Sequence, residues 1–312
     1  MDIIKDDIIK LLKDDSLIDL PLNIKNNIGN TSNVYIIKNY ICKVFDISKI
    51  DTKKYLADNE FYFYNKFKIN IENIINIPKF YGFIKNNNDE TYGLILENMN
   101  VINKFDIMYI LNIINHIIKL HLLYWNTDMT SIFNYENNGQ YIIDQKIKVE
   151  IKYYFNNIEN IFTNEIFNIF KNILDEIESE PSNNKTLIHG SFKLDNILLI
   201  RDDDDVIKPY LIDWSLYRIG YGVEDILFLM IMSLNNKVLK MNYKYLLNYY
   251  FKEINKFKEY SLDDYNKDIE KSLKGFLLYA IIGLNIKNHF SKIKDEKINQ
   301  YLLNYLYCLE LL

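Results

Sequence analysis

The hydrophobic pattern of the chain changes period near residue 100. Before that point, short β-branched and aromatic segments separated by turns rich in Asn and Asp indicate strands. We expect these strands at residues 33–38, 40–45, 79–84 and 92–97. A helix with a cap at Asp51 and Thr52 is expected over 51–69, and a shorter helix over 2–13. This order of elements favours an antiparallel sheet with one packed helix.

After residue 100, the apolar residues recur at a spacing near 3.6, which is typical of helices. The expected helices are 104–125, 148–179, 223–235, 241–258, 264–289 and 295–311. One segment, 186–214, interrupts them with two strand-like stretches around the acidic loop 202–205, and it predicts a small hairpin. We therefore expect an α+β protein of two lobes, a small one over 1–99 and a large helical one over 100–312.

Composition limits the classes of function. Hydrophobic residues make up 49% and charged residues 25% of the 312 positions, which indicates a globular protein. A net charge of −5 without a basic stripe disfavours a nucleic-acid partner. Cys42 and Cys308 form no disulfide framework or metal-ligand spacing. The longest apolar run, 226–232, is too short to span a membrane, so we expect a cytoplasmic protein.

The most specific pattern lies between residues 187 and 214. His189 and Gly190 are followed by Asn196, and Asp213 comes seventeen residues later between Ile212 and Trp214. Carboxylate and amide oxygens are hard ligands of the kind that Mg²⁺ prefers. Asn196 and Asp213 each adjoin one of two strand-like segments that could pair. The alternative is that Asp213 caps a turn and Asn196 is an ordinary loop residue.

This pattern resembles the catalytic loop and metal-binding segment of the aminoglycoside phosphotransferase and choline kinase group, which includes the ecdysteroid kinases. In that group the loop reads His-Gly-Asp-x-x-x-x-Asn and is followed by Ile-Asp-Trp or Ile-Asp-Phe. The resemblance implies a bilobal protein-kinase-like fold, with ATP and Mg²⁺ as cofactors and Asn196 and Asp213 as metal ligands. One position departs from the pattern, because Ser191 stands where the family has its catalytic Asp.

The remaining parts of a phosphotransferase site can be assigned along the small lobe. Gly29 and Ser32 lie in a small polar loop whose backbone N–H groups could face phosphates, although an ordinary hairpin turn is the alternative. Lys43 is the candidate phosphate cation and Glu60 its expected partner, in an accessible ion pair between strand and helix. Solvent-facing positions are the alternative for both.

Further along, the resemblance assigns the adenine-binding connector to the segment that contains Glu97 and Met99. It also matches Leu120, His121 and Trp125, and the segment 220–227, which we interpret as packing and capping features. His189 is expected to fix the loop through backbone contacts and not to bind metal.

Ser191 leaves two hypotheses open. A positioned general base typically contributes about 10²–10⁴ in rate, so its loss leaves slow transfer possible. The first hypothesis is an ATP-dependent phosphotransferase, impaired or atypical, that acts on a small-molecule hydroxyl. The second is a pseudokinase that binds nucleotide or a protein partner without transfer. Asp195 lies in the same loop but is expected to face elsewhere, and the acceptor is not readable from the sequence.

Overall fold

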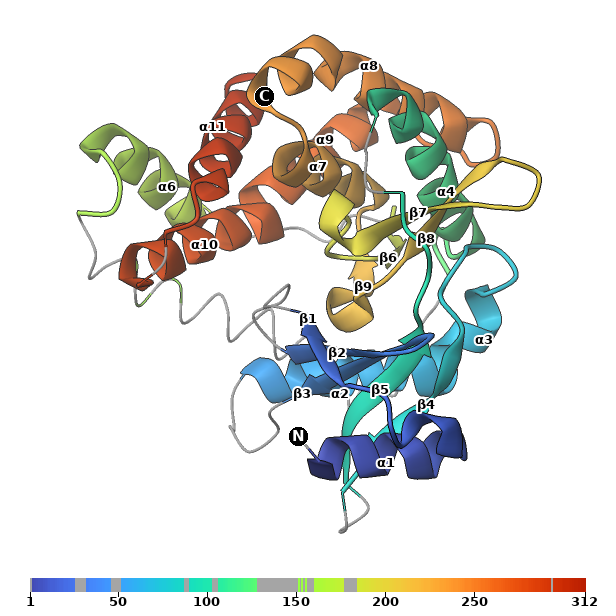
Figure 1. Ribbon diagram of the computed structural model, residues 1–312. Coiled ribbons are helices and arrows are strands. Elements are labelled where there is room, and N and C mark those ends of the chain that lie inside the picture. Colours follow the sequence, from blue (N-terminus) through green and yellow to red (C-terminus); the bar gives the residue numbers. More distant parts are fainter. Residues whose placement is uncertain are drawn as a thin grey trace. The chain divides into compact units, whose positions relative to one another are not determined.

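The computed structural model describes residues 2–25, 32–45, 52–86, 90–102, 106–127, 151, 153, 155, 160–176, 184–292 and 294–312. The chain forms two compact units (Figure 1). The first unit comprises Met1–Ile107 and Ile197–Leu216, and the second comprises Met108–Asn196 and Tyr217–Leu312.

The first unit is built on a five-stranded antiparallel sheet in the order β1-β2-β3-β5-β4. The strands are β1 (Asn23–Lys25), β2 (Ser32–Ile37), β3 (Tyr40–Phe45), β4 (Phe80–Lys85) and β5 (Thr91–Glu97). The four strands that the sequence predicts are present within two residues of the expected bounds. In the register, Lys43 of β3 pairs with Val34 on one side and with Leu94 on the other, so it lies in the middle of the sheet.

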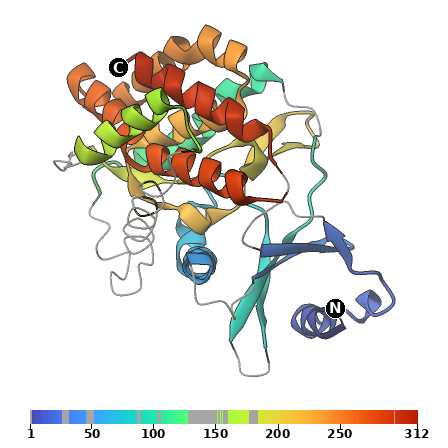
Figure 2. The same cartoon turned by 90° about the vertical axis from the view of Figure 1, so that its left-hand side faces the viewer.

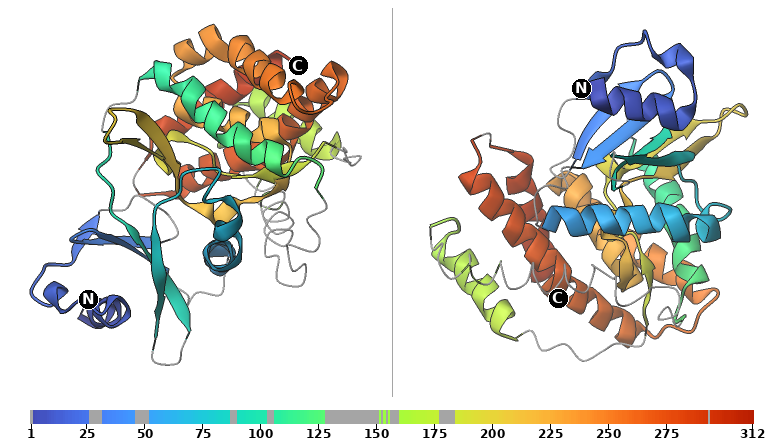
Figure 3. Two further views of the ribbon diagram at one scale, coloured as in Figure 1. Left: turned by 90° about the vertical axis from the view of Figure 1, so that its right-hand side faces the viewer. Right: turned by 90° about the horizontal axis from the view of Figure 1, so that it is seen from below.

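Alternation along β3 directs neighbouring side chains to opposite faces of the sheet. Cys42 and Val44 join an apolar core that α1 (Asp2–Leu12) covers. Lys43 and Phe45 point to the other face, where helix α2 (Thr52–Tyr62) lies. Figures 2 and 3 show α1 and α2 on the two sides of the strands. Helix α2 continues through a π-helical turn, Phe63–Phe67, into α3 (Lys68–Ile71).

The hairpin of β7 (Ile197–Arg201) and β8 (Ile207–Leu211) belongs to the first unit, although the sequence places it within the lobe 100–312. Backbone hydrogen bonds explain this difference. The Ile102 N–H donates to the Leu199 carbonyl oxygen, and the Leu211 N–H donates to that of Asn76. The expected boundary near residue 99 therefore does not separate the hairpin from the sheet.

The second unit is mostly helical. Its described α-helices are α4 (Ile110–Leu123), α6 (Asn164–Glu176), α7 (Gly222–Ser233), α8 (Asn236–Asn255), α9 (Leu262–Ser272), α10 (Leu278–Phe290) and α11 (Lys297–Glu310). Helix α7 is buried from Gly222 to Met232, and α4, α8, α9 and α11 all pack against it. An antiparallel sheet followed by a helical region confirms the predicted α+β fold class.

Short elements complete the second unit. Strands β6 (Thr186–Ile188) and β9 (Arg218–Gly220) form an antiparallel ladder beside α7, which the sequence does not predict. A π-helical turn, Leu273–Leu277, joins α9 to α10, and a 3₁₀ turn covers Leu194–Asn196. No helix among the described residues is long and apolar enough to cross a membrane.

Candidate active site

The first unit brings three of the predicted site residues together. Lys43 Nζ lies 2.6 Å from Glu60 Oε2 and 2.7 Å from Asp213 Oδ1, so one ammonium group bridges two carboxylates. The Asp213 oxygen also accepts a hydrogen bond of 3.0 Å from the Ser215 hydroxyl. The expected Lys43–Glu60 pair is therefore present. The expectation that it is accessible is wrong, because the Lys43 side chain is 12% exposed and that of Glu60 is 0% exposed.

Burial and charge shift the pKa values of this cluster in a consistent way. Burial raises the pKa of Glu60 to about 7, although Lys43 and the backbone N–H of Trp214 act to lower it. For Lys43, burial lowers the pKa but the Asp213 and Glu60 carboxylates outweigh it, and the net pKa is raised. Two carboxylates share one cation, so one excess negative charge remains. This excess charge is less favourable on Glu60, which is fully enclosed, than on Asp213, which is partly exposed. The pKa of Glu60 is therefore the one that rises.

Helix α2 is held against the segment that follows Asp213. The Phe63 ring stacks on Trp214 with centroids 4.2 Å apart, and the Asn59 amide donates to the Ser215 carbonyl oxygen at 2.8 Å. Asp213 itself has a positive φ of 63°, which turns the chain sharply after the hairpin. These contacts fix Glu60 and Asp213 in one rigid arrangement within the first unit.

In the second unit, the loop that begins at His189 is fixed by a buried carboxylate. The backbone N–H groups of His189 and Gly190 donate to the two oxygens of Asp225 at 2.8 and 2.9 Å. Gly190 has a φ of 75°, a conformation that glycine adopts without strain. The loop is thus tied to the first turn of α7.

Asp225 has a third partner. His121 Nε2 lies 3.2 Å from Asp225, and His121 Nδ1 lies 3.0 Å from the Tyr250 hydroxyl. Burial raises the pKa of Asp225, but the hydrogen bonds and charges of His121 and His189 hold it below its usual value. The sequence pointed to His121 and the 220–227 segment as packing features. It missed Tyr250 and the link from Asp225 to the loop.

Ser191 and Asn196 form a contact within the loop. The Asn196 amide nitrogen donates to the Ser191 carbonyl oxygen at 2.8 Å and to its hydroxyl oxygen at 3.0 Å. The Ser191 N–H donates to His189 Nδ1 at 3.3 Å, so His189 fixes the loop as expected. Among the described residues, no carboxylate or imidazole accepts the Ser191 hydroxyl proton. The serine is therefore not activated as a base or nucleophile in this arrangement.

Asn196 and Asp213 each carry an oxygen of the kind that Mg²⁺ prefers. Asn196 uses its amide nitrogen within the loop, and its Oδ1 accepts no hydrogen bond from the described residues. Asp213 offers a carboxylate. In the described ranges no group of three or more His, Cys, Asp or Glu side chains could hold a metal alone. Mg²⁺ is commonly bound by one or two protein oxygens plus phosphates and waters. Asn196 belongs to the second unit and Asp213 to the first.

The other predicted residues have different outcomes. Gly29 lies outside the described residues. Ser32 begins β2, opposite Phe45. At the end of β5, the Glu97 N–H donates to the Lys79 carbonyl oxygen. The Met99 N–H makes no hydrogen bond within the described part of the chain.

Asp195 does not replace the missing base. Its side chain is 55% exposed and lies 3.8 Å from Lys193 Nζ. Burial, and to a smaller extent the negative charges of Asp195 and Asp295, raise the pKa of Tyr301 in α11 to about 12. By contrast, Ser191 is buried. The expectation that Asp195 faces away from the Ser191 hydroxyl agrees with these surroundings.

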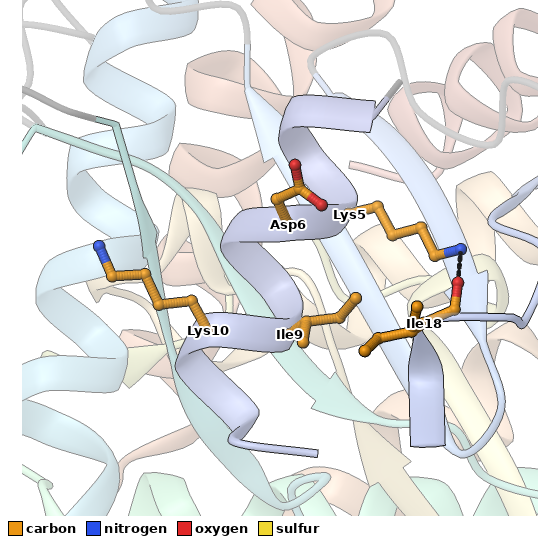
Figure 4. A pocket seen from close by; sticks show the side chains of 5 residues that line it. All are labelled: Lys5, Asp6, Ile9, Lys10 and Ile18. Atoms are coloured by element: carbon orange, nitrogen blue, oxygen red, sulfur yellow. Dashed lines mark hydrogen bonds between the residues drawn. The ribbon is translucent and has the colours of Figure 1, made fainter. Parts of the chain in front are cut away.

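A surface pocket of about 520 Å³ lies on α1 in the first unit (Figure 4). It is lined by Lys5, Asp6, Ile9, Lys10 and Ile18, and Lys5 closes one side with a hydrogen bond to the Ile18 carbonyl oxygen. None of the predicted site residues lines this pocket. The pocket is lined by both charged and apolar side chains, and its polar groups do not converge on one point. It is therefore not a candidate active site.

Comparison with known proteins identifies the fold. The sequence model of the ecdysteroid kinase-like family matches residues 127–261, which contain the loop and Asp213. The structure of aminoglycoside 2′-phosphotransferase-IIIa in its GDP complex is similar over 97% of this chain and 96% of that chain, with 10% identity and a TM-score of 0.60. The chain has the kinase-like fold of small-molecule phosphotransferases.

Two further structures with this fold come from other branches. The Plasmodium vivax ethanolamine kinase is 14% identical over 97% of this chain and 86% of that chain, with a TM-score of 0.55. A choline/ethanolamine kinase family protein from Mesorhizobium loti is 10% identical over 97% and 92%, with a TM-score of 0.56. A search of curated proteins finds no match. These findings confirm the resemblance to the aminoglycoside phosphotransferase and choline kinase group.

Proposed function

We propose that this protein binds a magnesium nucleotide, with ATP as the expected one, and slowly transfers its terminal phosphate to a small-molecule hydroxyl. The observation that carries this proposal is Lys43, which two carboxylates hold on the face of β3 where helix α2 lies. Phosphoryl transfer depends on positioning and on charge neutralisation more than on covalent help from the protein. A buried, ordered ammonium group on the sheet supplies the cation that this chemistry needs.

The metal part of the proposal assigns Asn196 and Asp213 as oxygen ligands. Asn196 Oδ1 makes no competing hydrogen bond among the described residues, and Asp213 lies two residues after the end of β8. When bound, Mg²⁺ would neutralise charge on the phosphates. In the same proposal Gly29 and Ser32 contribute to the phosphate loop, and Glu97 and Met99 to the adenine contact.

The slow rate in this proposal comes from Ser191. Without a positioned base the transfer barrier rises by roughly 3–5 kcal/mol, which corresponds to about 10²–10⁴ in rate. Positioning of the acceptor and neutralisation of charge remain available. The reaction would therefore be slow and not abolished.

A pseudokinase is the second candidate, and one observation favours it. Within the described residues, the Ser191 hydroxyl has no base as a hydrogen-bond acceptor, while Asn196 is engaged with Ser191. A protein of this kind would bind nucleotide and act through a partner. The two candidates share nucleotide binding and differ only in transfer.

Nucleotide binding is tested by calorimetry with Mg²⁺-ATP and Mg²⁺-GTP, because the aminoglycoside 2′-phosphotransferase-IIIa structure holds GDP. At a hundredfold excess over Kd, a ligand specific for the native state stabilises it by roughly 2.7 kcal/mol, which a melting experiment detects. Asp213→Asn should weaken binding at least tenfold. The matched control is Asp203→Asn, an exposed carboxylate in the turn of the same β7–β8 hairpin.

Transfer is then measured with a panel of amino alcohols, aminoglycosides and sterols. Turnover above that of Asp213→Asn supports a phosphotransferase. Nucleotide binding with turnover no higher than that of Asp213→Asn supports the pseudokinase. Absence of binding to either nucleotide at millimolar concentration contradicts both candidates.

A further inference from the structure

The turn that carries Asn196 is held from outside the loop. Within the loop, the Lys193 N–H donates to the Ser191 carbonyl oxygen and the Asn196 N–H donates to that of Lys193, both at 2.9 Å. Leu194 begins the 3₁₀ turn, and the first N–H groups of a helical turn have no acceptor inside it. The Leu194 N–H donates instead to the Ser233 hydroxyl oxygen at 2.9 Å. The position of the turn therefore depends on a side chain 39 positions further along the chain.

Ser233 is the last residue of α7, and the same helix holds the other end of the loop. Asp225, in the first turn of α7, accepts hydrogen bonds from the N–H groups of His189 and Gly190. Eight positions separate Asp225 from Ser233, which corresponds to about 12 Å along a helix. The loop is thus tied at both ends to one helix, whose length fixes the span between the two ties.

The end of α7 that carries Ser233 is itself fixed by α11. The last carbonyl groups of a helix have no partner within it. The Asn304 amide nitrogen, which is fully buried, donates to the Ile231 and Leu234 carbonyl oxygens at 2.9 and 2.8 Å. The Gln300 amide nitrogen also donates to the Leu234 oxygen, at 2.7 Å. These contacts lie on either side of Ser233 in the sequence and keep this helix end from fraying.

We propose that Ser233 is a positioning residue for Asn196. Its hydroxyl oxygen holds the Leu194 N–H, and with it the turn from which the Asn196 side chain extends. The Asn196 amide nitrogen is already bound to Ser191, so the direction of Asn196 Oδ1 follows the position of this turn. The metal contact of Asn196 rests on the proposed function, whereas the hold of Ser233 on the turn does not.

A matched pair of substitutions isolates the hydroxyl group. Thr and Val have nearly the same shape and similar helix propensity, so Ser233→Thr keeps the acceptor and Ser233→Val removes it. Amide hydrogen exchange is followed by NMR at Leu194 and Asn196, because protection reports local opening. We expect protection of both amides to fall roughly tenfold in Ser233→Val relative to Ser233→Thr. Unchanged protection at either amide would overturn the proposal.

A second pair of variants avoids the added methyl groups of Thr and Val. Ser233→Ala should lower protection at Leu194 and Asn196 in the same way as Ser233→Val. Ser272→Ala is its control, because Ser272 is likewise the last residue of a helix, α9, and its hydroxyl donates to the Asp268 carbonyl oxygen of that helix. We expect this control to leave exchange at Leu194 and Asn196 unchanged. Equal losses of protection in the two Ala variants would contradict a specific role of Ser233.

The requirement for metal gives the second test. Replacing a residue that orients a metal ligand typically lowers metal affinity by about 10–100-fold. The Kd for ATP is therefore measured by calorimetry at limiting and at excess Mg²⁺. Ser233→Val should raise Kd roughly tenfold at limiting Mg²⁺ relative to Ser233→Thr. The increase should be smaller at excess Mg²⁺, because a higher metal concentration offsets a weaker site by mass action.

The two tests separate this proposal from the proposed function. An increase in Kd of the same size at both Mg²⁺ concentrations, or no increase, would mean that Ser233 does not act on a metal ligand and would overturn the proposal. If the unchanged chain binds no ATP at either concentration, the proposed function fails, while hydrogen exchange still decides whether Ser233 holds the turn of Asn196.

Discussion

Phe63 and Trp214 stack face to face, with ring centroids 4.2 Å apart and planes inclined by 7°. The two rings join helix α2 to the segment that follows β8, although 151 positions separate them in the chain, from residue 63 to residue 214. Glu60 lies one turn before Phe63, and Asp213 directly precedes Trp214. The stack therefore sets the separation of the two carboxylates between which Lys43 lies.

Phe63→Ala should disturb both stability and nucleotide binding. Truncation of a fully buried aromatic side chain typically costs about 3–5 kcal/mol of unfolding free energy, because a cavity remains. Loss of the stack also frees Glu60 to move away from Lys43. Urea denaturation and calorimetry measure the two effects. Phe257→Ala is the control, since that ring is 70% exposed and should change neither quantity.

Ser191→Asp should restore a general base. Asn196 Nδ2 lies 3.0 Å from the Ser191 hydroxyl oxygen, and a carboxylate at this position can accept the same hydrogen bond. We expect transfer to a suitable alcohol to increase by about 10²–10⁴. Ser191→Asn is the matched control, because it has the shape of Asp without its basicity. Equal turnover in the two variants would mean that the position no longer meets an acceptor.

Glu60 should make the protein less stable as the pH rises through neutrality. Burial raises its pKa to about 7 from the usual value of 4.5. A carboxyl group with a raised folded pKa contributes stability that is fully present below the unfolded pKa of 4.5 and is lost as the pH rises through about 7. The loss is at most about 3 kcal/mol. Denaturation at pH 4 and pH 8 should therefore show a larger decrease in the unchanged chain than in Glu60→Gln. A decrease of the same size in both would contradict the assignment to Glu60.

Gly222→Ala should destabilise the second unit through a collision with a specific side chain. A Cβ atom at this position would lie 2.0 Å from the Tyr250 hydroxyl oxygen and 2.9 Å from His121 Nδ1. Overpacking of this kind typically costs about 1–3 kcal/mol, despite the better helix propensity of Ala. Adding Tyr250→Phe should recover part of the melting temperature, because it removes the colliding atom. A double variant less stable than Gly222→Ala alone would argue against this cause.

The local pattern of the sequence was sufficient to predict most elements. Strands β2 and β3 follow from β-branched segments separated by one turn, and α7 from an apolar run at helical spacing. The three-residue strands β6 and β9 could not be predicted, because a ladder of this length has no measurable period. The π-helical turns also interrupt helices whose apolar spacing continues unbroken across them.

Contacts within the site were predictable only where an ordered motif carried them. Lys43 and Glu60 lie on neighbouring elements, and their order along the chain identified the pair. Asp213 reaches the same ammonium group from 170 positions away, and His121 reaches Tyr250 from 129 positions away. Contacts of that kind depend on tertiary packing. The burial of these side chains could not be predicted from the sequence either. For this reason the Lys43–Glu60 pair was expected to be accessible.

The bridge from Lys43 to two carboxylates also has a consequence for the form of nucleotide that the cluster accepts. Above a pH of about 7, where Glu60 is ionised, Lys43, Glu60 and Asp213 together carry one negative charge. An uncomplexed nucleotide is a polyanion and meets net repulsion there, whereas its complex with a divalent cation has two fewer negative charges and is repelled less. We therefore expect the cluster to discriminate between free and metal-bound nucleotide by electrostatics alone, before any contact with the base or the sugar.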